Sequence, residues 1–132
     1  MDLATLFLAK AQESLAGADS ELLSRRFNNA ANRTYYACFH AAISALLDAG
    51  AATPGRRGEW GHDFVQARFA GELIARRKLY SSDLRDILGM TMRLRHKADY
   101  QDDGVSEVQA SRAVRRAHAL VEAIRQVAGG RL

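Results

Sequence analysis

With 132 residues and a formal net charge of +4, the chain fits one domain with a real core, and its charge permits an RNA or nucleotide partner without requiring one. A single cysteine, Cys38, excludes an internal disulfide, and no Cys/His metal spacing occurs, so we expect no metal and no cofactor, in a reducing cytoplasm. No apolar run has the length of a membrane span, and no basic segment precedes the first apolar residues, so neither a membrane anchor nor a signal peptide is expected.

The first part of the chain has the three- and four-residue spacing of apolar side chains that is typical of helices. This spacing predicts a first helix over residues 3–16, which ends near Gly17. Either a turn or the second helix follows, and Asp19 or Ser20 would cap that helix, because short side-chain oxygens accept bonds from the free amides at a helix start. The second helix is predicted to run to about residue 49.

The middle of the chain holds one clear loop, at about residues 50–62, which we expect to be flexible. It begins with Gly50, where the end of a helix favours glycine. The single tryptophan, Trp60, is expected to anchor this loop to the bundle, or alternatively to lie exposed at a partner interface. A third helix is predicted over residues 63–76 in spite of Gly71, which weakens it by about 1 kcal/mol relative to alanine.

Two further helices are predicted in the last third of the chain. Ser81 or Ser82 can cap the fourth helix, which ends before a turn at residues 101–104. Ser106 and Gln109 have the spacing of a capping box at the start of the last helix. The last helix is expected to bury one apolar stripe, made of Val108, Val114, Ala117, Leu120, Val121 and Ile124.

No stretch shows the two-residue alternation of a strand, and no internal repeat occurs. The predicted fold class is therefore all-α: an up-and-down bundle of four main helices plus a short helix. We expect residues 1–132 to form this single domain.

The second helix carries a polar stripe beside its apolar one. Arg33, Tyr36 and His40 follow at three- and four-residue steps, so they share a face, with Arg33 and His40 about 10 Å apart along the axis. Arginine suits phosphate, and histidine moves protons near neutral pH. The pair therefore suits RNA cleavage without a metal, with histidine as acid or base and arginine on the phosphorane charge. Alternatively, Arg33 pairs with a carboxylate, and His40 is a structural histidine at an interface with its hydrogen bonds formed.

The end of the fourth helix forms a second polar cluster. Four cationic and aromatic side chains share one of its faces: Arg93, His96, Lys97 and Tyr100. Together with Tyr36 of the second helix, they are expected to bind RNA or a nucleotide. Arg95 and Asp99 are four residues apart and can pair. A structural interpretation stands beside this one, in which the cations complement the helix dipole and an acidic turn containing Asp102 follows.

Two ordered motifs resemble one known family. Residues 32–42, NRTYYACFHAA, resemble the SRAYYAxFHAA helix of bacterial HEPN domains, and residues 94–103, LRHKADYQDD, resemble the LRxxADYxDD segment of the same family. His62 also sits where members often carry a histidine after the central loop. The resemblance covers about residues 3–126 and implies a helical bundle that commonly forms a homodimer.

The resemblance implies several functions. HEPN domains occur as ribonucleases or toxins, as partners of small nucleotidyltransferases encoded beside them, and as nucleotide-binding modules that cut nothing. Catalytic members place four to six residues between an arginine and a histidine, a pattern that Arg33 and His40 satisfy with six. In the best-known toxins the motif lies on a later helix, where Arg95 is the corresponding arginine and Tyr100 stands in the place of the histidine. A tyrosine acts as a base at neutral pH only after a large pKa shift.

We therefore expect a HEPN protein of a toxin–antitoxin or defence system. In this hypothesis Arg33, His40 and Arg95 are the catalytic residues of a dimeric, metal-independent endoribonuclease. The alternative is a non-catalytic module that binds a nucleotide or is paired with a small nucleotidyltransferase acting as its antitoxin. A third hypothesis is a plain dimeric scaffold, in which the arginines pair with carboxylates such as Asp99 and Asp102 in a structural role.

Overall fold

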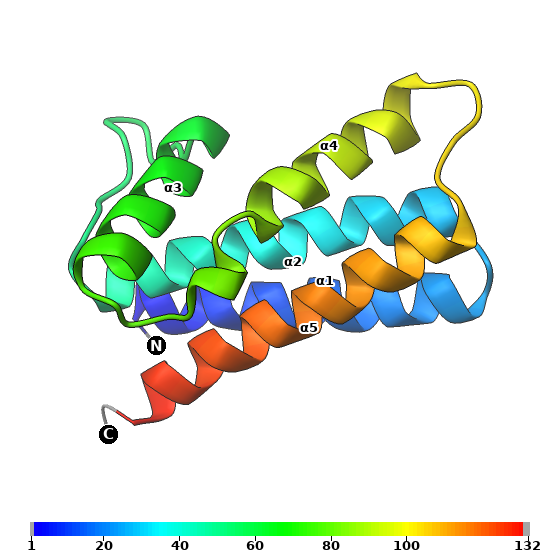
Figure 1. Ribbon diagram of the computed structural model, residues 1–132. Coiled ribbons are helices and arrows are strands. Elements are labelled where there is room, and N and C mark those ends of the chain that lie inside the picture. The colour runs from blue at the N-terminus through cyan, green and yellow to red at the C-terminus, as the bar shows by residue number, and fades with distance from the viewer. Residues whose placement is uncertain (1, 131–132) are drawn as a thin grey trace.

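Helix α2 runs through the middle of the molecule, and the other helices pack around it (Figure 1). The computed structural model describes residues 2–130. Both α1 and α5 pack against α2 and against each other, α4 packs on α2, and α3 lies near the C-terminal end of α2 (Figure 1). Within the described residues the elements are helical, with these bounds: α1 (Leu3–Leu23), α2 (Phe27–Asp48), α3 (His62–Arg68), the π-helical segment η1 (Phe69–Arg76), the short 3-10 turn η2 (Ser82–Leu84), α4 (Ile87–Tyr100) and α5 (Glu107–Gly129).

This arrangement confirms the predicted all-α class. The four main helices are α1, α2, α4 and α5, and α3 is the short one. Figure 1 shows α4 rising away from α5 towards its C-terminal end, so that the two helices diverge where the polar cluster of α4 lies. None of the helices within residues 2–130 combines the length and the apolar character that a membrane span requires.

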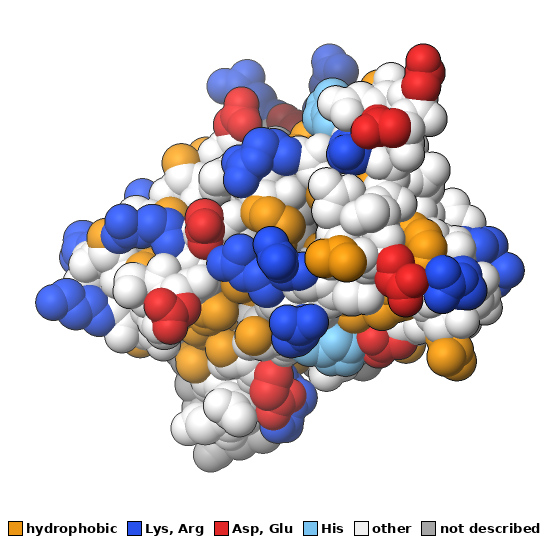
Figure 2. Space-filling view, turned by 45° about the vertical axis from the view of Figure 1, so that its right-hand side comes forward, with side chains coloured by type: hydrophobic (Ala, Val, Ile, Leu, Met, Phe, Trp, Pro, Cys, Tyr) orange, Lys and Arg blue, Asp and Glu red, His pale blue; other side chains and the backbone are white. Residues whose placement is uncertain are grey.

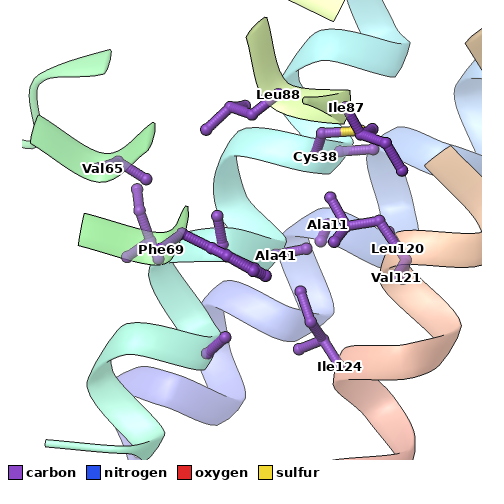
Figure 3. Close-up of a cluster of buried hydrophobic side chains, with 14 of the residues drawn as sticks. Ala11, Cys38, Ala41, Val65, Phe69, Ile87, Leu88, Leu120, Val121 and Ile124 are labelled. Atoms are coloured by element: carbon purple, nitrogen blue, oxygen red, sulfur yellow. The ribbon is translucent and has the colours of Figure 1, made fainter. Parts of the chain in front are cut away.

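The core depends on small side chains where the helices meet. Fully buried alanines lie on three helices: Ala11 and Ala18 on α1, Ala30, Ala37 and Ala41 on α2, and Ala110, Ala113 and Ala117 on α5. Methyl side chains let two helix backbones approach closely, because the distance between helix axes follows the side chains at the contact. Larger buried residues fill the space around these contacts, among them Ile87, Leu120 and Ile124 (Figure 3).

Three local predictions are confirmed. Gly50 ends α2 with a φ of 65°, a left-handed conformation that glycine adopts without the strain of a Cβ atom. Ser106 Oγ accepts a bond from the Gln109 amide at 3.1 Å, and Gln109 Oε1 accepts one from the Ser106 amide at 3.0 Å, which completes the capping box. Trp60 packs edge-on against Phe7 of α1, with ring centroids 6.2 Å apart, and so anchors the loop to the bundle.

The predicted end of the first helix at Gly17 is wrong, because α1 runs straight through this residue. A glycine inside a helix costs only about 1 kcal/mol, which contacts of α1 with α2 and α5 outweigh. Helix α2 begins at Phe27, so Asp19 and Ser20 lie inside α1 and cap no helix. Asp19 instead binds His118 of α5, with Oδ1 2.8 Å from Nε2.

The third predicted helix is divided into two parts. It changes at Arg68 from α-helix to the wider η1, where hydrogen bonds reach back five residues, as from the Arg77 amide to the Glu72 carbonyl oxygen at 3.0 Å. Gly71 lies in η1, and no atom comes within 4 Å of the position that a Cβ would take there, so this glycine does not mark a close helix contact.

Two further details differ from the predictions. Ser81 caps η2, with Oγ 3.2 Å from the Asp83 amide, whereas α4 begins at Ile87 without a side-chain cap. Val108 was expected in the core but is 67% exposed. It lies in the first turn of α5, the helix end at which α4 and α5 diverge (Figure 1), and most of its side chain is in solvent.

The path of α1 through Gly17 predicts that Gly17→Ala stabilises the protein by about 0.5–1 kcal/mol. A Cβ at this position would meet only the side-chain stem of Arg33, at the ordinary contact distance of 3.8 Å. Gly50→Ala is the matched control and should destabilise by about 1 kcal/mol, because its φ is positive. Urea denaturation followed by circular dichroism measures both, and a loss of stability in Gly17→Ala would contradict the continuous helix.

The buried position of Cys38 predicts a thiol that does not react in the native state. Burial raises the pKa of Cys38 to about 12, so almost none of it is thiolate at neutral pH. We expect Ellman's reagent to modify Cys38 only as fast as the protein unfolds, and at once in concentrated urea. Rapid modification of the native protein would show that the α2–α4 contact opens easily.

Candidate functional site

Arg95 of α4 lies above two consecutive tyrosines of α2. Its guanidinium carbon is 5.2 Å from the ring centroid of Tyr35 and 5.2 Å from that of Tyr36, which is within the range of a cation–π contact. Its Nε is buried and forms no hydrogen bond within residues 2–130, but it lies 3.5 Å from Asp99 Oδ2, so the predicted pair of Arg95 and Asp99 forms as an ion pair. The Arg95 side chain keeps 27% of its surface exposed, and this held cation can therefore still meet an anion from solvent.

His40 lies on the same side of α2, among aromatic rings. Its ring centroid is 5.6 Å from that of Phe7 on α1, and 5.9 Å from those of Tyr36 and Phe39. Its Nδ1 is buried, and no residue within 2–130 forms a hydrogen bond to it. Burial first, and then the charge of Lys10, hold the pKa of His40 below its usual range. The imidazole is consequently neutral at pH 7 and able to accept a proton.

Tyr36 joins these two groups. Its ring contacts the His40 imidazole on one side and the Arg95 guanidinium on another, and all three side chains remain partly exposed. We refer to Tyr36, His40 and Arg95 as the Tyr36 cluster. The packing of α4 on α2 therefore brings an arginine and a histidine that are distant in sequence to one tyrosine ring.

Arg33 lies outside the Tyr36 cluster, although it shares a helical stripe with Tyr36 and His40. Its stem packs over Gly17 of α1, and its side chain lines a polar groove of about 400 Å³ along that helix. Within residues 2–130, no hydrogen bond, ion pair or ring contact joins Arg33 to the cluster. The arginine that accompanies His40 is thus Arg95.

The remaining predicted residues lie on other faces of α4. Arg93 and Lys97 line a groove towards α5, and Lys97 Nζ is 3.3 Å from Asp103 Oδ2. Two aromatic groups lie near each other at the end of α4: the rings of His96 and Tyr100, 5.2 Å apart. Asp102 is exposed and makes no hydrogen bond or ion pair within residues 2–130, which leaves its expected structural role without a visible contact there.

A hydrogen-bonded chain beneath Arg95 was not predicted. The Tyr35 hydroxyl lies 3.0 Å from His62 Nδ1, and His62 Nε2 lies 3.0 Å from Gln66 Oε1. Nε2–H donates to Gln66, so Nδ1 accepts from the Tyr35 hydroxyl. Burial raises the pKa of Tyr35 to about 12, which keeps this hydroxyl protonated. The chain fixes the Tyr35 ring under Arg95.

A close approach of Gln66 on α3 to Gly89 on α4 places this chain. A Cβ on Gly89 of α4 would come within 2.7 Å of Gln66 Nε2, so the glycine makes room for the amide. The sequence marked His62 through its place after the loop, but it gave no sign that His62 would meet Tyr35, which lies 27 residues earlier. Within residues 2–130, no three His, Cys, Asp or Glu side chains are grouped so that they would hold a metal ion.

Comparison with known proteins identifies the family to which the chain is similar. A comparison with curated protein sequences finds no match. The family model described as HEPN domain matches residues 4–127. This range includes all the helices apart from the first residue of α1 and the last two residues of α5. The match contains both helices that carry the Tyr36 cluster. On this coverage, the chain belongs to the HEPN-domain family.

Proposed function

We propose that this protein is a metal-independent endoribonuclease of a toxin–antitoxin or defence system, and that it acts as a homodimer. The observation that carries the proposal is the Tyr36 cluster, in which a neutral imidazole and a guanidinium that is held in place both contact one partly exposed tyrosine ring. RNA cleavage needs a group that takes the 2′-hydroxyl proton and a cation for the phosphorane, and this pair supplies both.

His40 is the proton acceptor in the proposed reaction. The pKa of its imidazole is held below the usual range, so the base form prevails at neutral pH. The imidazole takes the 2′-hydroxyl proton as the 2′-oxygen attacks phosphorus, and the 5′-oxygen leaves with a proton from the imidazolium or from water. The products are a 2′,3′-cyclic phosphate and a 5′-hydroxyl end.

Arg95 stabilises the charge that develops on the phosphorane. Its planar guanidinium suits the bidentate binding of phosphate oxygens, and the two tyrosine rings and Asp99 restrict its position. Tyr36 offers a ring on which a base of single-stranded RNA can stack. The three side chains thus divide proton transfer, charge stabilisation and binding between them.

An apolar surface beside His40 supports the homodimer. Phe7 covers one side of the imidazole, and its neighbours on α1, Leu3 and Leu6, are 44% and 42% exposed. A second copy that covered these side chains would remove apolar surface from water and bring two Tyr36 clusters towards one cleft. Surfaces of this kind are typical of isologous contacts.

A second candidate function is a non-catalytic module paired with a small nucleotidyltransferase. It is favoured by the way that Arg95 is already engaged by Tyr35, Tyr36 and Asp99, and by the lack of an orienting hydrogen bond on His40 Nδ1 within residues 2–130. In this function the cluster binds a nucleotide or the partner and turns over no RNA.

RNA cleavage decides between the two functions. We expect the purified protein to cleave total RNA in EDTA, with the rate falling about 10²–10⁴-fold in His40→Ala and about 10²–10³-fold in Arg95→Ala. Arg33→Ala should change the rate less than about tenfold, because Arg33 lies outside the cluster. His118→Ala and Arg115→Ala are exposed controls, and circular dichroism checks that every variant folds.

Absence of cleavage by the wild-type protein would support the second function instead. A stable complex with a small nucleotidyltransferase, shown by co-purification, would then be expected. Cleavage that survives in folded His40→Ala would contradict the assigned base even if the protein is a ribonuclease.

The lowered pKa of His40 predicts the pH dependence of the rate. A base is active when it is deprotonated, so the rate should rise with pH, reach half of its maximum below about pH 6.5 and stay level above it. Lys10→Gln removes a positive charge near the imidazole and should move the midpoint to higher pH. NMR titration of the histidine ring protons measures the same pKa without relying on activity, and a His40 pKa at or above that of an ordinary histidine would contradict the burial argument.

A further inference from the structure

A second groove lies between α4 and α5, on the side of α4 that faces away from Arg95. Its volume is about 300 Å³. Six side chains line it: Met90, Arg93, Leu94, Lys97, Gln109 and Arg112. The groove forms where α4 rises away from α5 (Figure 1). Figure 2 shows the face that includes these two helices, with Lys and Arg side chains spread among hydrophobic ones.

The charge of this groove is one-sided. Arg93, Lys97 and Arg112 line it, and no carboxylate does. Arg93 and Arg112 form no ion pair with any residue in 2–130. Lys97 reaches Asp103 of the α4–α5 turn at 3.3 Å, and this aspartate side chain is 72% exposed. The rim therefore offers two guanidinium groups that no carboxylate neutralises. It also offers Lys97, whose exposed partner Asp103 can be replaced by the carboxylate of a ligand.

The floor of the groove is apolar. Met90 and Leu94 provide it, and one turn of α5 before Arg112 stands a further apolar side chain, Val108, which is 67% exposed. None of the six lining side chains is aromatic, so an RNA base would find no ring on which to stack. An apolar floor between cationic walls matches the chemistry of an amphipathic helix with acidic flanks.

We propose that the α4–α5 groove docks an acidic, amphipathic helical segment of a partner protein. Aliphatic side chains of the segment pack on Met90 and Leu94, and carboxylates on its flanks bind Arg93 and Arg112. A further carboxylate takes the place of Asp103 on Lys97 in the complex. This surface goes beyond RNA cleavage, because it uses none of the side chains of the Tyr36 cluster.

Synthetic peptides of about 18 residues test the proposal with the full-length protein. The acidic probe is a fluorescein-labelled helix with leucines at i, i+4 and i+7 and glutamates on both flanks, and its control carries lysine in place of every glutamate. Fluorescence anisotropy at about 0.15 M salt should show micromolar binding of the acidic peptide and at least tenfold weaker binding of the lysine peptide. NMR should place the acidic peptide at the Met90 methyl group.

Charge reversal locates the contact. Arg112→Glu and Arg93→Glu should each weaken binding of the acidic peptide about tenfold or more, whereas Arg115→Glu, the same change on the exposed side of α5, should alter it less than about twofold. All three sites are exposed, and circular dichroism confirms that the variants fold.

Three results would overturn the proposal: no binding of the acidic peptide at millimolar concentration, equal binding of the lysine peptide, or binding that is indifferent to Arg93→Glu and Arg112→Glu. A single-stranded RNA oligonucleotide is titrated in parallel. The groove is an RNA surface and not a docking site for protein if three results occur together: the wild-type protein binds the RNA, the two variants do not bind it, and the acidic peptide does not bind.

Discussion

The close packing of α2 against α1 and α5 is the constraint on which the remaining structure depends. Alanines occupy these contacts on all three helices, so the side of α2 that faces α1 and α5 carries few large side chains. The aromatic residues of α2 are directed to its other sides, where Tyr35 meets α3 and α4 and Tyr36 remains partly exposed. A core built from small residues thus leaves Tyr36 and His40 of α2 partly exposed, whereas Tyr35 is buried beneath Arg95.

The placement of Arg95 follows from this division. A guanidinium above two rings and beside one carboxylate loses less by desolvation than a cation in an apolar core, because the ring faces and Asp99 replace part of its water. The Tyr35 ring that lies under it is held by His62 of α3. Three helices therefore fix one cation. The imidazole of His40, for which only ring contacts occur within residues 2–130, is the less restrained member of the Tyr36 cluster.

Local sequence patterns predicted correctly the caps and pairs that involve neighbouring residues. They failed for helix ends and side-chain contacts that depend on residues distant in the sequence. The capping box at Ser106, the left-handed Gly50 and the pair of Arg95 and Asp99 each involve residues within a few positions, and all three form. The predicted helix end at Gly17 is wrong, because contacts with other helices stabilise α1 through this glycine and the local sequence does not contain those contacts. The choice between Arg33 and Arg95 as the neighbour of His40 likewise depends on how α4 packs on α2, which spacing along one helix does not contain.

Helix α4 contributes side chains to two different surfaces because of the 3.6-residue repeat of an α-helix. Residues two positions apart on a helix point about 200° apart, so Arg93 and Lys97 face α5 while Arg95, between them in sequence, faces α2. One short helix therefore presents cations in opposite directions: Arg95 is held by aromatic rings, Arg93 forms no ion pair within residues 2–130, and Lys97 pairs with Asp103. The positive charge of this segment is accordingly not a single patch. Substitution of Arg95 therefore tests the Tyr36 cluster, and substitution of Arg112 on α5 tests the groove. Arg93 is less selective, because its Nη1 lies close to the Gly89 position that Gln66 of α3 also borders.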